Sequence, residues 1–518
     1  MKNVRNILLV AAILLMTSVI VRPATGELDI NLGYRNIDED GNESVDQPSA
    51  NLYDGVSVSM ENMKYVFDNG LLLRSNFNNI NLDSRNLMFD FSKPGLFGVN
   101  VKTNRYRRIY GADGDECTKR DLTSARVWVN PTKNIKLFAD GSFNYISGET
   151  VDLFSTSFGL LPREVDYKRN KFTFGGRAKY QGRLFQGEYG TSKFTDDTRD
   201  GNDQTRTLYR VIGMTPMPEF EWLLLTGTYQ QFINEYDDTD FRIKSWTFKG
   251  SALARLSGQF TFNYIALYNR VGSDSDFVET DNLAHNLYLT YLHSRKLGAT
   301  IGYQNHVNDD YEDEVKSNAF FIECWGSPSD KLDLKASYGH RAEEVDEGSR
   351  LIGDEDRNRM KFMAKYKFAM SSTFKAQIES RRRKNDQLGS EAEFVMLSFE
   401  GMHDLPKYAQ LIAGYSYSDG KYTNTGQTFE YKHHQLHAGI HSHEYNRITL
   451  GAMAIYYKSE CDLDTEGSDL RFTGDYKFNS GVKIEFAYNV LNFDDFLYGD
   501  HYYTANIVEL NIIKSFKF

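Results

Sequence analysis

The stretch "GVKIEFAYNV", Gly481 to Val490, alternates apolar and polar side chains near the end of a chain of 518 residues. Every second residue from Val482 to Val490 is apolar, while Lys483 and Glu485 lie between them. A period of two is the period of a β-strand, whose side chains point alternately to opposite faces. The stretch therefore predicts a strand with one apolar and one charged face.

The same alternation recurs along the chain. Three further examples are "KFTFGGRAKY" (171–180), "KLDLKASYGH" (331–340) and "TFKAQIESRR" (373–382). Tyr (33) and Phe (35), which favour strands, are abundant, whereas Pro (9), which strands exclude, is scarce. The mean hydropathy is −0.53, and past residue 26 no apolar run approaches the ~20 residues of a membrane helix. The composition predicts an all-β protein.

The connections between these segments alternate in character. One set is short and rich in turn residues, such as "DNG" 68–70, "QGR" 181–183 and "NSG" 479–481. The other set is more variable, often longer and often acidic, such as "NDDYEDE" and "CDLDTEGSD". Twelve connections of the first kind and thirteen of the second predict 26 strands, with 24 as the nearest alternative, and place both termini on the short-turn side.

Short turns on one side, longer loops on the other and an apolar outward band are typical of outer-membrane β-barrels of Gram-negative bacteria. Closing the sheet gives every backbone group a partner, which a lipid environment demands. A periplasmic β-sandwich or propeller is the soluble alternative, but it does not explain the alternating connections. We therefore expect residues 27–518 to form a single large antiparallel barrel without a plug domain. Its turns and both termini then face the periplasm.

The N-terminus predicts export. "MKNVRN" is basic, Ile7 to Val21 is apolar, and "RPATG" ends in small residues, which is the pattern of a signal peptide cut after Gly26. An uncleaved membrane anchor is the alternative. Removing Lys2, Arg5 and Arg22 takes the formal net charge from −11 to −14. Such an acidic chain is a poor nucleic-acid binder.

The C-terminus ends on an alternating strand, "IVELNIIKSFKF", with Phe516 and Phe518 on one face. This ending resembles the signal read by the outer-membrane barrel assembly machinery, which we therefore expect as a partner beside the membrane lipids.

A barrel this wide needs an occupant. Diameter grows about linearly with strand number, and ~22-stranded transporters need a plug. The longest predicted loops, at about 147–162 and 38–51, are too short to close the lumen alone. We therefore expect another polypeptide inside it.

In this architecture the chain resembles the MtrB/PioB family of large outer-membrane barrels. The resemblance covers residues 27–518 and rests on the signal peptide, the strand count and the missing plug. It implies a porin-like sheath for a multihaem c-type cytochrome in transmembrane, extracellular electron transfer. A passive channel or porin for a bulky solute is the alternative function.

The alternation also predicts which side chains face the lumen. We expect these to be Lys171, Arg177, Lys179, Arg381, Arg383, His433, His437, His441, His443, Lys483 and Glu485. The four histidines come from "KHHQLHAGIHSH" (432–443), where a polar lining, contact with a partner and a metal site all remain open interpretations. Same-face positions two apart lie ~7 Å apart, so only His441 and His443 could share a metal.

Several functions are not expected. The three cysteines, Cys117, Cys324 and Cys461, are an odd number with wide spacing, so no disulfide framework is predicted. No C-x-x-C-H occurs, so the chain attaches no haem of its own, and haem is expected only in a partner. No G-x-S-x-G or other nucleophile motif occurs. We expect no catalysis, no cofactor or metal held by this chain, and no nucleic-acid partner.

Overall fold

The computed structural model describes residues 23–43, 52–110, 116–152, 161–199, 202–217, 219–237, 239, 241–274, 279–294, 296–310, 314–346, 354–369, 371–496 and 502–517. Their regular structure consists of 26 strands. No described segment is a helix long and apolar enough to cross a membrane.

The strands are β1 (Pro23–Gly41), β2 (Gly55–Phe67), β3 (Leu72–Asn78), β4 (Asn86–Lys93), β5 (Phe97–Ile109), β6 (Cys117–Thr132), β7 (Ile135–Asp152), β8 (Leu161–Tyr180), β9 (Arg183–Asp196), β10 (Gln204–Met217), β11 (Phe220–Tyr236), β12 (Arg242–Arg255), β13 (Phe260–Ser273), β14 (Glu279–Ser294), β15 (Leu297–Asp310), β16 (Glu314–Ser329), β17 (Leu332–Asp346), β18 (Glu355–Ala369), β19 (Ser372–Asn385), β20 (Ser390–Leu405), β21 (Ala409–Asn424), β22 (Gln427–Ser442), β23 (Ile448–Cys461), β24 (Thr465–Lys477), β25 (Val482–Asp495) and β26 (Tyr503–Lys517).

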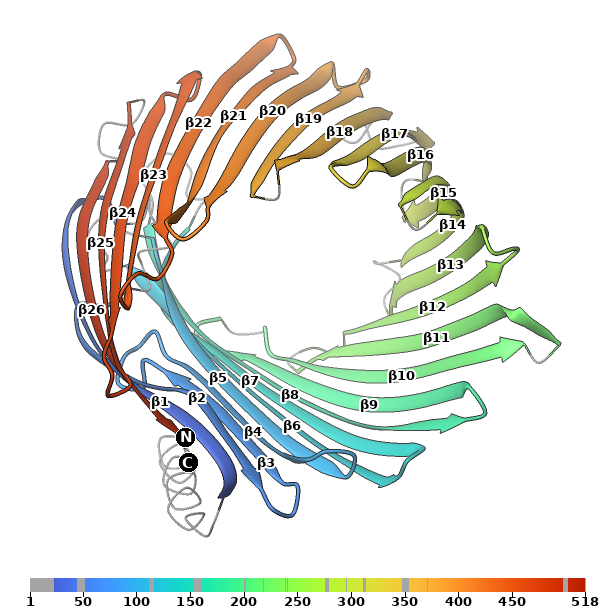
Figure 1. Ribbon diagram of the computed structural model, residues 1–518. Coiled ribbons are helices and arrows are strands. Elements are labelled where there is room, and N and C mark those ends of the chain that lie inside the picture. Colours follow the sequence, from blue (N-terminus) through green and yellow to red (C-terminus); the bar gives the residue numbers. More distant parts are fainter. Residues whose placement is uncertain are drawn as a thin grey trace.

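The sheet closes on itself. Each strand pairs antiparallel with its neighbours in sequence, and β1 pairs with β26 through fifteen residue pairs, from Glu27 with Lys517 to Gly41 with Tyr503. Figure 1 looks into the resulting open lumen. At this seam Gly33 lies between Ser57 of β2 and Asn511 of β26, and a Cβ there would clash with both side chains. The predicted closed antiparallel barrel of 26 strands is confirmed.

The two edges of the barrel differ as the sequence predicts. The twelve connections after even-numbered strands have two to five residues and define the tight-turn edge. The thirteen connections after odd-numbered strands have two to thirteen residues and define the outer-loop edge. Gln181 and Gly182 both have positive φ, as a two-residue type I′ hairpin requires. Because the strand number is even, both ends of the sheet lie at the tight-turn edge.

One of the two longest predicted loops is shorter than expected because its strands run further. β7 and β8 reach Asp152 and Leu161, so half of the stretch 147–162 is strand, whereas β1 ends at Gly41 and the first outer connection spans 42–54. Residues 44–51 and 153–160 lie outside the described residues. Other outer connections are also short: β21 and β22 are joined by Thr425 and Gly426 alone. Loop length therefore distinguishes the two edges on average, and not at every hairpin.

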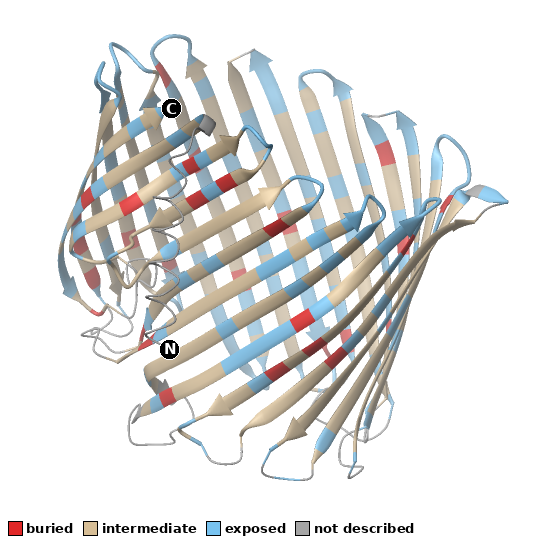
Figure 2. Cartoon of the chain, turned by 90° about the horizontal axis from the view of Figure 1, so that it is seen from below, coloured by how far each residue is buried: buried red, intermediate tan, exposed pale blue. Residues whose placement is uncertain are grey.

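The barrel has a wall and no central core. Large apolar side chains are exposed at alternate positions, as with Phe172 and Phe174 on β8, while Thr173 between them is buried. Figure 2 shows the few buried residues scattered along the wall. Among the described residues, Tyr503, Ala505 and Ile507 on β26 form a cluster of buried apolar side chains, against which Leu52 of the first outer connection packs. An exposed apolar outer face is what a lipid-facing surface requires.

Aromatic side chains gather at the tight-turn edge. Tyr408 and Tyr445 lie in tight turns and are 75% and 72% exposed. Ring pairs occur at other turns of this edge, with centroids 4.6 Å apart for Tyr476 and Phe478. Aromatic girdles mark the membrane–water interfaces of outer-membrane barrels, so this edge has the composition of an interface.

The predicted segments at the chain ends lie partly outside the described residues, which exclude 1–22 and Phe518. β1 begins at Pro23, four residues before the expected mature start at Glu27, so the expected cleavage would trim the first residues of this strand. Phe516 lies on β26, paired with Leu28.

Candidate functional site

The candidate site is the inner face of the barrel, which we define as the face opposite the exposed apolar side chains. Directly paired residues share a face, so the register carries this definition from strand to strand. On β8, β18, β19, β22 and β25 the inner residues have odd numbers, because Phe174, Phe362, Phe374, Leu436 and Phe486 are exposed on the other face. All the residues predicted to face the lumen have odd numbers on these strands or just beyond them.

The inner face of β18 and β19 holds a buried ionic network. The Glu379 side chain is only 3% exposed, and its Oε1 accepts hydrogen bonds from Arg359 Nε at 3.0 Å and Arg381 Nε at 2.5 Å. Lys361 Nζ lies 3.8 Å from its Oε2. Three cations from two strands thus surround one carboxylate.

A second buried carboxylate repeats this arrangement nearer the outer-loop edge. The Glu355 side chain is 6% exposed and pairs with Arg357 on its own strand. Arg383 of β19 reaches it at 2.6 Å. Glu343 on β17 joins the network through Arg357 at 3.3 Å. Charged hydrogen bonds of this kind add geometric definition as well as energy, so they fix the relative positions of these strands.

The inner face of β8 is different. Lys171 and Lys179 are exposed, and no carboxylate of the described residues lies within 4 Å of either. Arg177 Nε is buried without a hydrogen-bond partner. Arg169 donates to Ser192 Oγ at 3.2 Å, which is an uncharged partner. These cations are therefore not neutralised by the barrel itself.

On β25 the two predicted residues neutralise each other. Lys483 Nζ lies 2.6 Å from Glu485 Oε1 and 3.7 Å from Asp475 Oδ2 on β24. The charges on this part of the inner face are therefore paired within the barrel wall.

The histidines of β22 are spread out along the strand. His433 Nδ1 lies 2.9 Å from Ser459 Oγ on β23, and His437 and His441 follow at four-residue intervals on the same face. His443 falls beyond the end of β22, in the tight turn, where its Nε2 lies 2.6 Å from Asp404 Oδ1. Among the described residues no group of three or more His, Cys, Asp or Glu side chains could hold a metal ion. The histidine stretch therefore forms separate polar contacts.

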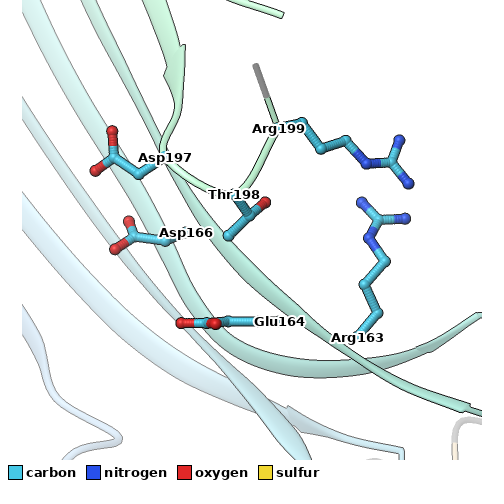
Figure 3. A pocket seen from close by; sticks show the side chains of 6 residues that line it. All are labelled: Arg163, Glu164, Asp166, Asp197, Thr198 and Arg199. Atoms are coloured by element: carbon cyan, nitrogen blue, oxygen red, sulfur yellow. The ribbon is translucent and has the colours of Figure 1, made fainter.

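A charged hollow of about 480 Å³ lies at the outer-loop edge between β8 and β9 (Figure 3). Arg163 and Arg199 point toward one another on one side, while Asp166 and Asp197 lie together on the other. Lys168 Nζ lies 2.5 Å from Asp197 Oδ2. Glu164 and Thr198 complete the lining of this hollow, so all of its lining residues are charged or polar.

The cysteines are free in the described residues. Cys117 begins β6 and Cys461 ends β23, so both border outer connections, while Cys324 lies within β16.

Sequence reasoning missed the basic residues of β18 and the two buried glutamates. A signal was present: "EDRNRMKFMAKYK" (355–367) places Arg or Lys at five alternate positions. The first outer-face residues of β18, Asp356 and Asn358, are polar, so the alternation of apolar and polar side chains is not visible at the start of this strand.

Comparisons with known proteins show the fold alone. No family model matches the chain, and no curated protein sequence matches it. Among solved structures, the ferric preacinetobactin receptor BauA of Acinetobacter baumannii is similar with a TM-score of 0.50 at 10% identity, covering 94% of this chain and 80% of that one. A chain of the FpvAI–pyocin S2 complex is similar with a TM-score of 0.50 at 8% identity, covering 95% of this chain and 73% of that one.

The chain is therefore a large β-barrel of the outer-membrane type. Its described residues include no plug domain, so the inner face borders an open lumen.

Proposed function

We propose that this barrel is a porin-like sheath for a multihaem c-type cytochrome that carries electrons across the outer membrane. The observation that carries the proposal is a lumen enclosed by 26 strands that no described segment fills. Barrels of about 16 to 18 strands already leave an aqueous channel, so a wider empty one would breach the permeability barrier. A second polypeptide in the lumen resolves this conflict. The resemblance to the MtrB/PioB architecture supports a cytochrome as that polypeptide.

The inner wall has the properties that a protein occupant needs. It is polar and mixed in sign, with carboxylates and guanidinium groups held in defined positions by ion pairs such as Arg359 with Glu379. A folded occupant presents fixed charges, so a wall with fixed charges can be complementary to it. Haem belongs to the partner in this proposal, since no C-x-x-C-H occurs in this chain.

Co-purification tests the sheath directly. The tagged full-length protein is extracted from native membranes in mild detergent, and the gel is stained for haem. We expect one stained partner, and adjacent genes encoding secreted chains with many C-x-x-C-H motifs. In liposomes the pair should let an external oxidant drain electrons from a sealed reductant while passing few ions, whereas the barrel alone should pass ions freely and release the reductant itself.

A passive channel for a bulky solute is the second candidate, and the same open lumen favours it. Planar-bilayer recording separates the two when combined with the haem stain. A very large, weakly selective current from the isolated barrel, together with no haem partner in native membranes, would favour the channel. A small, selective conductance would contradict both functions, because it requires a narrow constriction in the lumen.

A further inference from the structure

The inner face of β8 is a basic stripe. Between residues 169 and 179 its inner positions carry Arg169, Lys171, Arg177 and Lys179 and no acidic side chain. The whole chain has a formal net charge of −11, so the charge of this stripe is opposite in sign to that of the chain as a whole.

The inner face of β18 is a second basic stripe. Its alternate positions from Arg357 to Lys367 carry five basic residues, and Glu355 at the start of the strand is the single inner acid. Over β17, β18 and β19 together, the odd-numbered residues from 333 to 385 on these strands include ten basic and four acidic side chains. Glu355 and Glu379 pair with arginines in the half of β18 that lies nearer the outer-loop edge. Lys365, in the other half, has no carboxylate of the described residues within 4 Å.

The stripes lie on opposite sides of the lumen. Figure 1 shows β8 and β18 facing each other across the opening. The inner face is not uniformly charged: the inner positions of β13 and β14 carry no Asp, Glu, Lys or Arg, and are rich in Asn, as at Asn263 and Asn286. Arg120 and Arg126 of β6 and Arg206 and Arg210 of β10 also occupy inner positions on either side of β8. The basic side chains are therefore concentrated on a wall around β8 and on the opposed wall around β18.

We infer that the occupant of the lumen is a folded protein with an acidic surface, seated between the β8 and β18 stripes. This inference rests on the proposed sheath function. An extended anionic polymer strand would contact one wall at a time, whereas a folded protein that fills the lumen contacts both. Unpaired lysines on the two walls then find their carboxylate partners on the occupant.

Ion selectivity of the isolated barrel tests the charge of the lumen. The Debye length is about 8 Å at 0.15 M salt and about 30 Å at 0.01 M, so wall charges influence ions across a wide lumen only when the salt is dilute. We expect the reversal potential in a KCl gradient to shift toward the chloride equilibrium potential near 0.01 M, and to approach zero near 0.15 M. Cation selectivity at low salt would overturn the inference.

The variant K171Q/K179Q/K365Q removes unpaired cations from both stripes. The matched control K133Q/K331Q/K407Q removes the same charge from exposed tight turns. We expect the stripe variant to have a measurably weaker anion preference and the control to keep it. Heat-modifiable migration on gels verifies that both variants form the barrel. Equal selectivity of the two folded variants would overturn the role of the stripes.

Partner retention tests the occupant. We expect the haem-stained partner to elute from the stripe variant at lower salt than from the control, and retention that is equal in both would overturn the inference. An anion-selective barrel that recovers no partner would overturn the sheath itself and the protein occupant with it. Block of that empty barrel by dextran sulfate but not by neutral dextran of equal size would assign the stripes to an anionic polymer instead.

Discussion

β8 and β18 present the same kind of side chain to the lumen, but the surroundings of those side chains differ. On β18, Arg357 and Arg359 pair with Glu355 and Glu379, whose side chains are almost fully buried. On β8, Lys171 and Lys179 have no carboxylate partner among the described residues. Buried charges need partners, whereas solvated ones do not. The comparison separates cations that hold neighbouring strands together from cations that remain available to an occupant.

The largest expected effect tests whether the two strands differ only on their inner faces. Phe174→Lys on β8 and Phe362→Lys on β18 place a charge on the outer, apolar face of each strand. Each should reduce the free energy of unfolding by about 2–4 kcal/mol if the site lies near mid-bilayer. Urea unfolding of the barrel refolded in lipid vesicles measures the change.

Phe174→Leu and Phe362→Leu are the controls and should be nearly neutral by comparison. If Phe→Lys lowered the free energy of unfolding strongly on one strand and not on the other, the inner and outer faces of the unaffected strand would be wrongly assigned.

An intermediate effect is expected from the buried network. Glu379→Ala removes a carboxylate that accepts charged hydrogen bonds from two arginines, and should cost about 1.5–3 kcal/mol. Glu400→Ala is the control, because the Glu400 side chain is 30% exposed and, among the described residues, has Lys375 as its single ion-pair partner, at 2.5 Å. An exposed pair of this kind contributes about 0–1 kcal/mol. Equal losses would show that burial of Glu379 contributes nothing.

The smallest effect is expected on β8. The double variant Lys171→Gln, Lys179→Gln removes solvated charges that have no partner in the barrel, so the free energy of unfolding should change by about 0.5 kcal/mol or less. The same unfolding experiment detects it. A loss comparable to that of Glu379→Ala would mean that these lysines are structural, and the contrast between the two strands would disappear.

The fold could be predicted from the sequence because its two signals are local. Alternation assigns each strand, and turn residues such as Gly182 and Gly481 mark its end, so neither requires knowledge of distant contacts. The spread of outer-loop lengths was predicted less well, because strand ends such as Thr150 and Arg163 pair beyond the region of clear alternation.

The candidate site was predicted only in part, because its ion pairs depend on contacts between different strands. Arg381 follows from alternation within one strand, but its carboxylate partner at Glu379 is shared with Arg359, which is brought near by the register of β18 against β19. That register depends on the short connection between β18 and β19, and a slip of one residue would turn every side chain to the other face. The β18 stripe also escaped notice because Asp356 and Asn358 make the outer face of that strand polar at its start. Ion pairs between strands are thus a property of the assembled sheet.

The seam between β1 and β26 has a consequence for the order of assembly. Every other pairing joins strands adjacent in the chain, whereas Arg35 and Glu509 meet across 474 residues. Loop-closure entropy grows only with the logarithm of the loop length, but non-local pairing slows folding. Strands adjacent in the chain can therefore pair first, while the edges of β1 and β26 are still unpaired. The β1–β26 seam then forms last. The start of β1 and the end of β26 already lie side by side. A circularly permuted chain, in which these ends are joined and one tight turn is opened, should therefore form the same barrel with its seam at the opened turn.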